Sequence, residues 1–570
     1  MSASNPAEKT ESKTPPETLS GADIVVRLLE RQGITTVAGI PGGAILPFYD
    51  ALSKTDKIHH VLARHEQGAG FMAQGMARAT GKPAVCLASS GPGATNLLTA
   101  IADAKLDSIP IVAITGQVPK AMIGTDAFQE VDTYGLTIPI TKHNFLVSSA
   151  EELLEVIPRA FTIAASGRPG PVLVDIPKDV QTQRIEVKEW PAPGLPEPAP
   201  LFDAAAIEQA VAMIEAADKP ILYLGGGVVH SGAAELAVAL AEKASLPTVM
   251  TLMALGALPV DHPLSLGMLG MHGARCTNLA LDECDLLIAV GARFDDRATG
   301  KVAAFCPGAK IIHIDIDPSE LDKIKAAHLG ITGDVSEVLQ VLLPKVQPTL
   351  RKRWLSHVAG LKAAHPLQTP GIDDPRTHYG LISAVAAALN DEATISTDVG
   401  QHQMWVSQAY PLRRPRQWLT SGGLGTMGFG VPAAIGAALA EPQRTVVCFS
   451  GDGSILMNIQ ELVTAAEEGA NVKIVLMNNA TLGLVHQQQT LFYGERIYAS
   501  KFKAVPDFIK VAEGFGIRAV DLDKAAQPRV ALADALNTPG PCLIHASIDM
   551  HEKVYPMVPP GASNKEMIGG

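Results

Sequence analysis

The sequence lacks an excess of positive charge, and charged residues of either sign are few. Of its 570 residues, 46 are lysine or arginine and 58 are aspartate or glutamate, which gives a formal net charge of -12. A nucleic-acid-binding protein normally carries a basic face or stripe. The composition therefore argues against that class and favours small molecules or other protein chains as partners.

Cysteine pairs are also missing. The six cysteines are Cys86, Cys276, Cys284, Cys306, Cys448 and Cys542. None of them stands in a C-x-x-C spacing, so neither a zinc site nor a disulfide framework is indicated. We expect reduced, mostly buried thiols in a cytoplasmic protein.

The sequence has no segment typical of a secretory signal or a membrane span. Residues 1–19 are polar and contain proline but no apolar core, which predicts a disordered leader rather than a signal or transit peptide. The uncharged stretch 419–440 is about as long as a bilayer requires. Its glycines and Pro432 favour instead a loop followed by a buried helix.

What is present is typical of a large α/β protein. Hydrophobic residues make up 47% and charged residues 18%, and the chain is too long for one core. Short β-rich runs alternate with helices of small residues, which predicts three doubly wound parallel-sheet domains with helices on both faces. A Pro-rich passage at 190–200 and a polar break at about 347–378 separate them. The predicted parts are the leader (1–19), a first domain (20–189), a central domain (201–346), a third domain (375–547) and a C-terminal tail (548–570).

The first and third domains resemble each other at an offset of 360 residues. Small residues coincide: Gly70, Ala73, Ala77, Ser90, Gly91 and Gly93 fall on Gly430, Ala433, Ala437, Ser450, Gly451 and Gly453. Shared small-residue composition is one explanation, and duplication of one fold is the other. Two copies of a fold suggest a cofactor bound between them.

The segment GDGSILMNIQELVTAAEEGANVKIVLMNN, residues 451–479, has an acid between two glycines and ends in paired asparagines. We expect a strand at 445–450, a glycine turn, a helix over ILMNIQELVTAAEEG and an adjacent strand. Asp452 and Asn479 would then emerge at one sheet edge beside a helix N-terminus, where they suit Mg²⁺ that also binds diphosphate oxygens. The alternative is Asp452 as a helix cap and the asparagines as a turn.

The G-D-G to N-N pattern resembles the thiamine diphosphate (ThDP) motif of the ThDP-dependent decarboxylases and carboligases. The resemblance implies that Asp452, Asn479 and the main chain of Thr481 bind the metal. It also implies a glutamate in the other copy of the fold, and VLARHEQGAGF supplies Glu66. In that family this Glu hydrogen-bonds N1′ of the aminopyrimidine and stabilises its imino tautomer. Without the resemblance, Glu66 would more often be a helix-cap or surface acid.

The similarity extends along nearly the whole chain. GIPGGAILPFYDAL, SSGPGATN, GTDAFQE, GARFDDR, GQHQMW and TSGGLGTMGFGVPAAIG occur in this order and together look like the catalytic subunits of bacterial biosynthetic acetohydroxyacid synthases (acetolactate synthases). The resemblance implies decarboxylation of pyruvate and transfer of the two-carbon unit to a second 2-keto acid, giving 2-acetolactate or 2-aceto-2-hydroxybutyrate. It implies the cofactors ThDP, Mg²⁺ and FAD. The implied partners are a second copy of the chain, in a homodimer or dimer of dimers, and a small regulatory subunit.

The resemblance also assigns roles around ThDP and the substrate. Gly43 lies near the thiazolium, and Met427 supports the bent cofactor. The residues expected around the diphosphate are Gln401, His402, Gly451, Gly453 and Ser454. Phe128, Gln129 and Lys178 line the substrate entry. Without the resemblance, the simpler interpretations are that Met427 fills space in the core, that Phe128 packs against other apolar side chains and that Lys178 is a solvated surface charge.

The central domain is expected to hold FAD as a structural group, since the reaction transfers no net electrons. A glycine turn lets backbone approach a pyrophosphate, an arginine can pair with it, and an acid at a strand end can accept a ribose hydroxyl. The implied contacts are Arg168, Gly225, Gly226, Gly227, Thr251, Leu252, Met268, Gly270, His272, Gly291, Arg293, Asp295, Arg297, Asp315 and Asp334. Arg297 is equally a candidate for the carboxylate of the second keto acid or for a salt bridge to Asp295 or Asp296.

One departure from the family concerns the acceptor. Many members have a Trp after the N-N motif that favours 2-ketobutyrate, but Gln488 stands at that place here, so that preference is in doubt. Rival functions are another ThDP enzyme, such as a catabolic acetolactate synthase, pyruvate oxidase or glyoxylate carboligase, and a silent nucleotide-binding scaffold. GARFDDR disfavours the FAD-free catabolic enzyme, and Glu66 disfavours glyoxylate carboligase.

Overall fold

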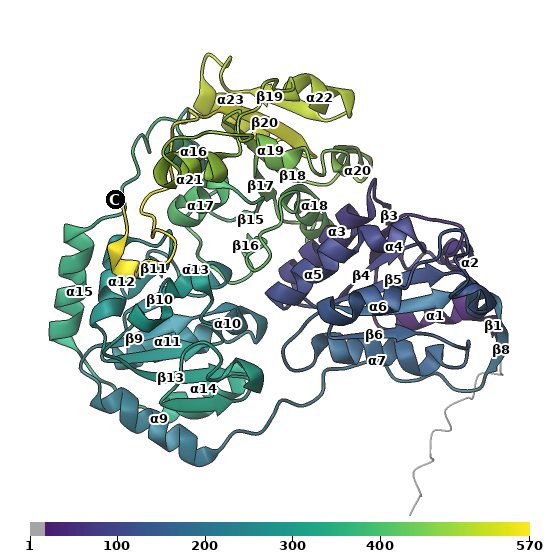
Figure 1. Cartoon of the computed structure of the whole chain (residues 1–570), viewed down its shortest axis with the longest axis horizontal. Coiled ribbons are helices and arrows are strands. Elements are labelled where there is room, and N and C mark those ends of the chain that lie inside the picture. The colour runs from purple at the N-terminus through teal and green to yellow at the C-terminus, as the bar shows by residue number, and fades with distance from the viewer. Residues whose placement is uncertain (1–16, 570) are drawn as a thin grey trace, which may run out of the picture.

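The structure is a computed structural model that describes residues 17–569. Three six-stranded parallel sheets, each with its own helices, form three domains, as predicted (Figure 1). The N-terminal sheet contains β2 (Thr36–Gly39), β3 (His59–Leu62), β4 (Ala84–Ala88), β5 (Ile111–Gln117), β6 (His143–Leu146) and β7 (Val172–Pro177). Its helices are α1 (Gly21–Arg31), α2 (Leu46–Leu52), α3 (Glu66–Thr80), α4 (Pro92–Asn96), α5 (Leu98–Asp107), α6 (Thr133–Thr137), α7 (Leu153–Ala165) and α8 (Lys178–Thr182).

The central domain occupies the lower left of Figure 1. Its strands are β9 (Pro220–Leu224), β10 (Thr248–Met250), β11 (Ser265–Met268), β12 (Leu286–Val290), β13 (Lys310–Asp315) and β14 (Leu329–Thr332). Its helices are α9 (Ala204–Ala216), α10 (Gly226–His230), α11 (Ala234–Ala244), α12 (Arg275–Glu283), α13 (Asp296–Thr299), α14 (Val335–Lys345) and α15 (Lys352–Ala364). Counted within the sheet, the strand order is 3-2-1-4-5-6, the order of dinucleotide-binding folds.

The C-terminal domain lies at the top of Figure 1. Its strands are β15 (Thr394–Thr397), β16 (Trp418–Leu419), β17 (Val446–Gly451), β18 (Val472–Asn478), β19 (Arg518–Asp521) and β20 (Cys542–Ser547). Its helices are α16 (His378–Ala388), α17 (Gln401–Ala409), α18 (Gly430–Ala440), α19 (Asp452–Ile455), α20 (Glu461–Glu467), α21 (Gly483–Phe492), α22 (Phe508–Gly514) and α23 (Pro528–Asn537).

The N- and C-terminal sheets share one topology. Their strand orders, β3-β2-β4-β5-β7-β6 and β16-β15-β17-β18-β20-β19, are the same when each sheet is numbered from its own first strand. The small-residue helices matched by the 360-residue offset, α3 and α18, occupy equivalent places between the second and third strands. The shared order supports duplication of one fold over chance composition.

Helices α3 and α18 pack backbone to backbone where the two copies meet. A Cβ at Gly75 would lie 2.0 Å from the carbonyl oxygen of Ala433, and a Cβ at Gly436 would lie 2.0 Å from that of Met72. Each helix thus places a glycine against a backbone carbonyl of the other helix, so the two close contacts are reciprocal. Glycine is required at both crossings.

Gly75→Ala should separate these helices and destabilise the protein. Alanine normally improves a helix by about 0.5–1 kcal/mol, but overpacking costs about 1–3 kcal/mol, so we expect a lower urea midpoint. Gly360→Ala is the matched control, because Gly360 is exposed in α15 and a Cβ there would meet nothing within 4 Å. Equal midpoint shifts in the two variants would contradict the close crossing.

The structure corrects three sequence-based expectations. Residues 17–19, predicted to lie in the leader, belong to β1 (Glu17–Ser20), which pairs antiparallel with β8 (Arg184–Val187); Leu19 is buried there. The polar break at 347–378 contains α15, whose Trp354 is buried and donates its Nε1–H to the carbonyl of Pro220, 3.0 Å away. The single helix expected after Gly453 is instead α19 and α20, separated by a turn. Residues 1–16 of the predicted leader lie outside the described residues.

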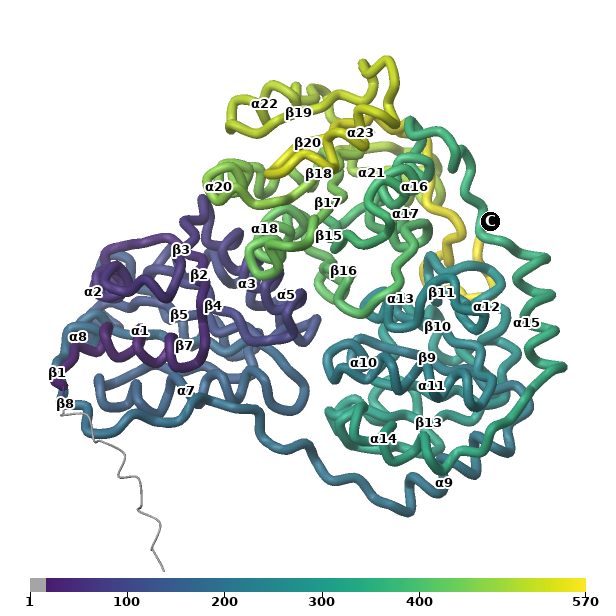
Figure 2. The backbone as a smooth tube through the Cα atoms, turned by 180° about the vertical axis from the view of Figure 1, so that it is seen from behind, coloured from purple at the N-terminus to yellow at the C-terminus, as the bar shows by residue number. Residues whose placement is uncertain are grey.

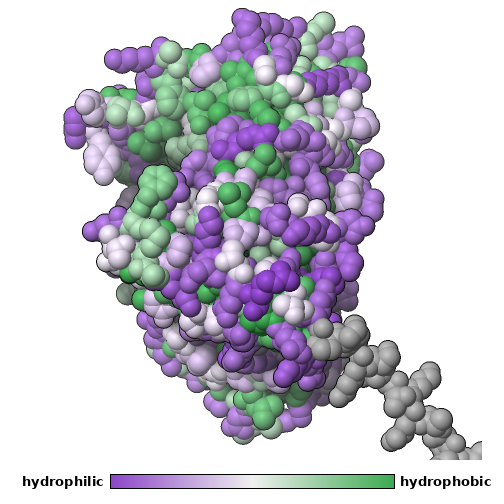
Figure 3. All heavy atoms as spheres, turned by 90° about the vertical axis from the view of Figure 1, so that its right-hand side faces the viewer, coloured by the Kyte–Doolittle hydropathy of each residue, from purple (hydrophilic) through white to green (hydrophobic). Residues whose placement is uncertain are grey.

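Other expectations agree with the structure. Stretch 419–440 forms a loop and the buried helix α18, and none of the helices in the described part of the chain is long and apolar enough to cross a membrane. All six cysteines are buried and free. The Pro-rich passage carries no helix or strand and runs along the lower edge of the molecule toward α9 (Figure 2). Figure 3 shows apolar side chains gathered toward the top of one face and mostly polar ones below.

Candidate active site

Asp452 and Asn479 lie at the same edge of the C-terminal sheet. Strands β17 and β18 pair in parallel, so their carboxyl ends place Asp452 at the start of α19 and Asn479 directly after β18. Both side chains are buried. Asp452 makes no side-chain cap to α19, whereas Asn478 and Asn479 accept backbone N–H bonds from Ala480 and Thr481, at 3.2 Å each. The cap alternative is therefore absent, and the turn alternative is present.

The Asp452 carboxylate is under-satisfied. Its Oδ2 is buried without a hydrogen-bond partner in the described part of the chain, and burial raises the pKa of this carboxyl to about 6. A buried polar atom without a partner is rare in folded proteins and needs an explanation. A hard cation would satisfy this oxygen, since Mg²⁺ takes carboxylate, amide and carbonyl oxygens. The residues present thus fit a metal ion.

A chain of amides orients Asn479. Its Nδ2 donates to Oε1 of Gln401 at 3.0 Å, and Gln401 Nε2 donates to Gln487 Oε1 at 3.2 Å and to the carbonyl of Glu552 at 2.8 Å. Gln487 also exchanges hydrogen bonds with the backbone of Val554. The C-terminal tail therefore closes over α17 and α21.

His402 lies against the glycines of the same edge. A Cβ at Gly451 would be 2.9 Å from its Nδ1, and a Cβ at Gly400 would be 2.7 Å from its Cε1. Burial lowers the pKa of His402 to about 3, which keeps the ring neutral, and its Nε2 is buried without a partner among the described residues. The neutral imidazole therefore has one ring nitrogen free to form a hydrogen bond with a bound ligand, and it adds no positive charge to the site.

Met427 and Ser454 complete this group. The Met427 Cε lies 3.6 Å from where a Cβ at Gly453 would stand, and Ser454 Oγ donates to the carbonyl of Val399 at 2.9 Å. The loop that carries Met427 is held by Asp398, whose Oδ1 accepts the N–H groups of Gly428 and Gly430 at 2.8 and 3.0 Å. Sequence reasoning missed Asp398, although an acid at a strand end just before GQHQ was a usable signal.

Glu66 is the first residue of α3 and is half-buried. Asn96 donates its Nδ2–H to Glu66 Oε2 at 2.9 Å, and a Cβ at Gly93 would lie 3.3 Å from Oε1. Burial and the nearby Glu66 charge raise the pKa of Tyr49. Asn96 was missed even though it stands in the quoted motif SSGPGATN. Gly43 is exposed on the loop before α2.

Glu66 and Asp452 are not joined within one chain. Across residues 17–569, no hydrogen bond or ion pair connects Glu66 with Asp452, Asn479 or Thr481. The two predicted halves of a ThDP site are thus each formed on their own copy of the fold.

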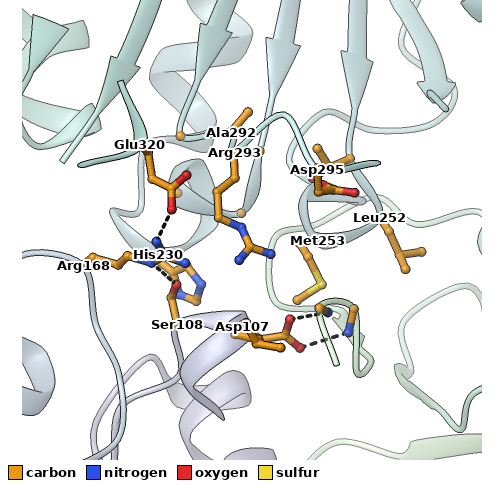
Figure 4. Close-up of a pocket in the computed structure, with 18 of the residues that line it drawn as sticks. Asp107, Ser108, Arg168, His230, Leu252, Met253, Ala292, Arg293, Asp295 and Glu320 are labelled. Carbon is orange, nitrogen blue, oxygen red and sulfur yellow. Dashed lines mark hydrogen bonds and ion pairs between the residues drawn. The ribbon is translucent and has the colours of Figure 1, made fainter. Parts of the chain in front are cut away.

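A cavity of about 970 Å³ lies beside the central domain (Figure 4). Most residues predicted to contact FAD line it: Arg168, Gly225, Gly226, Gly227, Thr251, Leu252, Met268, His272, Gly291, Arg293, Asp295, Arg297, Asp315 and Asp334. Gly270 is the exception among them. Its φ is +87°, a Cβ there would lie 2.2 Å from the carbonyl oxygen of Arg297, and Asn278 hydrogen-bonds its backbone, so Gly270 supports the wall without lining it.

The glycine turn after β9 packs tightly on the end of β12. A Cβ at Gly225 would lie 2.1 Å from the Gly291 carbonyl oxygen, and one at Gly227 would lie 2.7 Å from the Gly291 Cα. Arg293 extends into the cavity in Figure 4. Asp315 ends β13, and burial raises the pKa of its carboxyl to about 6. Backbone, arginine and strand-end acid thus surround one space, as expected for a dinucleotide.

The other two domains also contribute to this cavity. Arg168 pairs with Glu320 at 2.6 Å and donates to Ser108 Oγ at 2.8 Å, while Asp107 accepts the N–H groups of Gly422 and Gly423 (Figure 4). Ser108 and Asp107 come from the N-terminal domain and the glycines from the C-terminal one. Sequence reasoning missed Asp107 and Ser108, since nothing local marks a contact made across domains.

The predicted substrate residues fall into two groups. Arg297 and Gln488 line the cavity. Arg297 pairs with Asp296 at 3.8 Å, with both side chains mostly exposed, so of its two candidate acidic partners the structure shows Asp296. Phe128, Gln129 and Lys178 lie outside the cavity. Phe128 is 86% exposed, and Gln129 has a φ of +59° beside Gly91.

The loop that carries Phe128 is tied to a buried acid. Gln117 Nε2 donates to the Val131 carbonyl at 2.9 Å and to Asp175 Oδ2 at 3.0 Å, and Thr115 Oγ1 donates to Asp175 Oδ1 at 2.7 Å. Burial raises the pKa of Asp175 to about 7, against the opposing effect of these hydrogen bonds. Asp175 thus takes up a proton in the folded state more readily than in the unfolded one.

Asp175→Asn should flatten the pH dependence of stability. An unfolded aspartate titrates near 3.9, so the raised folded-state pKa gives a stabilising contribution that is full below about pH 4 and is lost as the pH rises through about 7. Asparagine stays neutral, and the decline in unfolding free energy between about pH 4 and 7 should shrink by a few kcal/mol at most. Urea unfolding across this range measures it, with the exposed Asp534→Asn as control. An unchanged slope in Asp175→Asn would contradict the assignment.

Comparison with known proteins also divides the chain into three domains. Profiles of the thiamine pyrophosphate enzymes match residues 19–136 as the N-terminal TPP binding domain, 207–342 as the central domain and 398–546 as the C-terminal TPP binding domain. The acetolactate synthase isozyme 1 large subunit of Escherichia coli (strain K12) is 63% identical over 550 residues, which cover 96% of this chain and 98% of that protein. The chain belongs to the acetolactate synthase family of thiamine pyrophosphate enzymes.

Further acetolactate synthases are similar over comparable lengths. The isozyme 2 large subunit of the same organism is 50% identical over 554 residues, covering 96% of this chain and 99% of that protein. Acetolactate synthase 1, chloroplastic, of Nicotiana tabacum is 46% identical over 583 residues, covering 98% and 87%. Within the family's division, Glu66 stands in the N-terminal TPP binding domain and Asp452 and Asn479 in the C-terminal one.

Proposed function

We propose that this chain is the catalytic subunit of an acetohydroxyacid synthase. It decarboxylates pyruvate and joins the two-carbon unit to a second 2-keto acid, which gives 2-acetolactate or 2-aceto-2-hydroxybutyrate, the first common step of branched-chain amino acid synthesis. The observation that carries the proposal is the buried Oδ2 of Asp452 beside Asn479, which has no hydrogen-bond partner among residues 17–569, on a fold whose duplicate presents Glu66. The names of the relatives agree with it.

The chain's residues divide the work of holding ThDP. Asp452, the Asn479 amide and the Thr481 carbonyl would hold Mg²⁺, with the diphosphate against Gly451, Gly453, Ser454, Gln401 and His402. When bound, ThDP supplies the nucleophilic carbon and the electron sink that decarboxylation needs. Glu66 would hold a proton at N1′ of the aminopyrimidine, and Met427 would support the bent cofactor near Gly43.

FAD fits the cavity of the central domain as a structural group. The 3-2-1-4-5-6 strand order, the glycine turn at 225–227 and Asp315 at a strand end support it. Arg293, which enters the cavity, would pair with the pyrophosphate. The net reaction transfers no electrons, so the flavin would stabilise the fold and the cavity wall.

Arg293→Met should release the flavin. Hydrogen bonds to charged groups contribute about 1.5–3 kcal/mol, so we expect FAD affinity to fall roughly 10- to 100-fold. The absorbance of flavin retained after gel filtration, followed by titration of FAD into the stripped protein, measures this. Arg353→Met, on an exposed position of α15, should keep its flavin. Full retention of flavin by Arg293→Met would count against the assigned pairing.

Other chains are expected to complete the enzyme. Because Glu66 and Asp452 are not joined within one chain, we infer that ThDP binds between two copies, in a homodimer or dimer of dimers. Phe128, Gln129 and Lys178 would then line the substrate entry of a neighbouring copy. Several relatives are named as large subunits, which supports a small regulatory subunit. The six free, buried cysteines fit a cytoplasmic location.

Competition between two acceptors tests the substrate assignment. Gln488 lines the cavity and is exposed, so it offers no aromatic surface to the extra methylene of 2-ketobutyrate, a contact worth about 1–3 kcal/mol. We expect the enzyme supplied with pyruvate and 2-ketobutyrate together to form both products without strong preference. Acetaldehyde or acetyl phosphate as the product would instead favour another ThDP enzyme.

A further inference from the structure

Helix α20 of the C-terminal domain lies beside β3 of the N-terminal domain in both views (Figures 1 and 2). Its first residue, Glu461, is fully buried at 0% exposure. Glu461 stands in neither the metal group nor the flavin cavity, and no role for it follows from the sequence motifs. A buried carboxylate is retained only where it is well paired, so its partners indicate what it does.

The partners of Glu461 are backbone groups directly before Glu66. Its Oε1 accepts the N–H of Arg64 at 3.0 Å and the N–H of His65 at 3.0 Å, and Oε2 accepts the N–H of Arg64 at 3.3 Å. Thr464 Oγ1 donates to Oε2 at 2.7 Å. One carboxylate of the C-terminal domain thus fixes two consecutive peptide groups of the N-terminal domain.

A glycine in the first turn of α3 makes room for the Glu461 carboxylate. A Cβ at Gly68 would lie 2.4 Å from Glu461 Oε1, so only glycine leaves room for the carboxylate in the first turn of α3. His65 caps that turn, since its Nδ1 accepts the N–H of Gln67 at 3.1 Å. The position of the Glu66 backbone is therefore set on one side by Glu461 and on the other by the capped helix.

We propose that Glu461 is a positioning residue that holds the turn bearing Glu66 and so sets where the Glu66 carboxylate can hold its proton. The inference rests on the function proposed above for Glu66. The contact also couples the two copies of the fold within one chain, because Glu461 belongs to the C-terminal domain and Glu66 to the N-terminal one. A shift of the C-terminal domain would therefore move the turn that bears Glu66. A displacement of about 1 Å at a reacting group can reduce turnover about 100-fold.

Two variants disturb the contact from opposite sides. Glu461→Ala removes the acceptor, and Gly68→Ala forces it away. In each we expect turnover to fall roughly 10- to 100-fold with little change in ThDP affinity, because the proposed metal and diphosphate ligands lie on other elements. Glu461→Gln should recover much of the loss, since its amide oxygen can still accept both N–H groups. Glu467→Gln is the matched control on the same helix, because Glu467 forms an exposed ion pair with Arg64.

Two readouts separate positioning from general destabilisation. Glu461→Ala combined with Glu66→Gln should show almost no further loss beyond Glu66→Gln alone, as expected when one residue acts through the other. Amide hydrogen exchange of the peptide over residues 59–68 should speed up in full-length Glu461→Ala and not in Glu467→Gln. The proposal would be overturned if Glu461→Ala reduced turnover by the same factor in the Glu66→Gln variant as in the unmodified enzyme. Unchanged amide exchange in the peptide over residues 59–68 would also overturn it. If the unmodified enzyme forms no acetolactate, the proposed function fails, and the exchange result still decides whether Glu461 holds the turn.

Discussion

Glu66→Gln should lose most of its turnover while it still binds ThDP. Glutamine keeps the shape of the side chain and its contact with Asn96, but an amide cannot exchange a proton with N1′ of the aminopyrimidine. Acid–base contributions of this kind are typically worth about 10²- to 10⁴-fold in rate. The expected result is therefore a fall in kcat of that size, measured as acetolactate formed from pyruvate at saturating cofactors.

The controls for this variant address folding and binding separately. Glu208→Gln, at an exposed ion pair with Lys345, should leave kcat unchanged. ThDP affinity of Glu66→Gln, followed by protein fluorescence, should stay close to that of the unmodified protein, because Asp452 and its neighbours are intact. Undiminished turnover in Glu66→Gln would refute the role assigned to this residue.

Asp452→Asn should abolish tight binding of Mg²⁺ and ThDP but should not weaken the empty protein. The variant removes a carboxylate whose Oδ2 is buried without a partner among residues 17–569, so folding no longer buries an unpaired acid. It also removes the only charged ligand proposed for the metal. We expect affinity to fall by more than the roughly 10- to 100-fold that loss of an outer partner costs.

Opposite responses of stability and binding make this test specific. Urea unfolding without cofactors should give a midpoint for Asp452→Asn equal to or above that of the unmodified protein, while calorimetric titration with ThDP and Mg²⁺ shows lost affinity. Asp534→Asn, which alters an exposed pair with Arg518, should change neither quantity appreciably. A purely structural Asp452 would give the reverse pattern: a lower midpoint with ThDP affinity preserved.

The sequence predicted the fold class because its signals are local and repeated. Buried parallel strands read as apolar runs between glycine turns. The 360-residue offset was visible because α3 and α18 both carry small residues, among them Gly70 and Ala73 in one helix and Gly430 and Ala433 in the other. The helix α15 was missed because its burial depends on Trp354 reaching the distant Pro220 carbonyl. The helix expected after Gly453 was too long because ILMNIQEL keeps helical periodicity through the turn that separates α19 from α20.

The candidate site was predictable where family motifs name residues and unpredictable where domains meet. The structure gathers most of the predicted FAD residues around one cavity, and it places Asp452 beside Asn479. Whether these residues bind the cofactors stays a prediction. Asp107 and Glu461 act through partners more than 300 residues away in the chain, and nothing within a few residues of either indicates such partners. Gly270 is the predicted flavin contact that does not line the cavity, because its backbone packs against the carbonyl of Arg297 in the wall.

The most direct test of the account is acetolactate formation from pyruvate with ThDP, Mg²⁺ and FAD omitted one at a time. We expect acetolactate when all three cofactors are present, and loss of product when ThDP, Mg²⁺ or FAD is absent from protein stripped of it. Acetaldehyde, acetyl phosphate or no product under complete conditions would contradict it, while leaving the thiamine pyrophosphate enzyme fold in place.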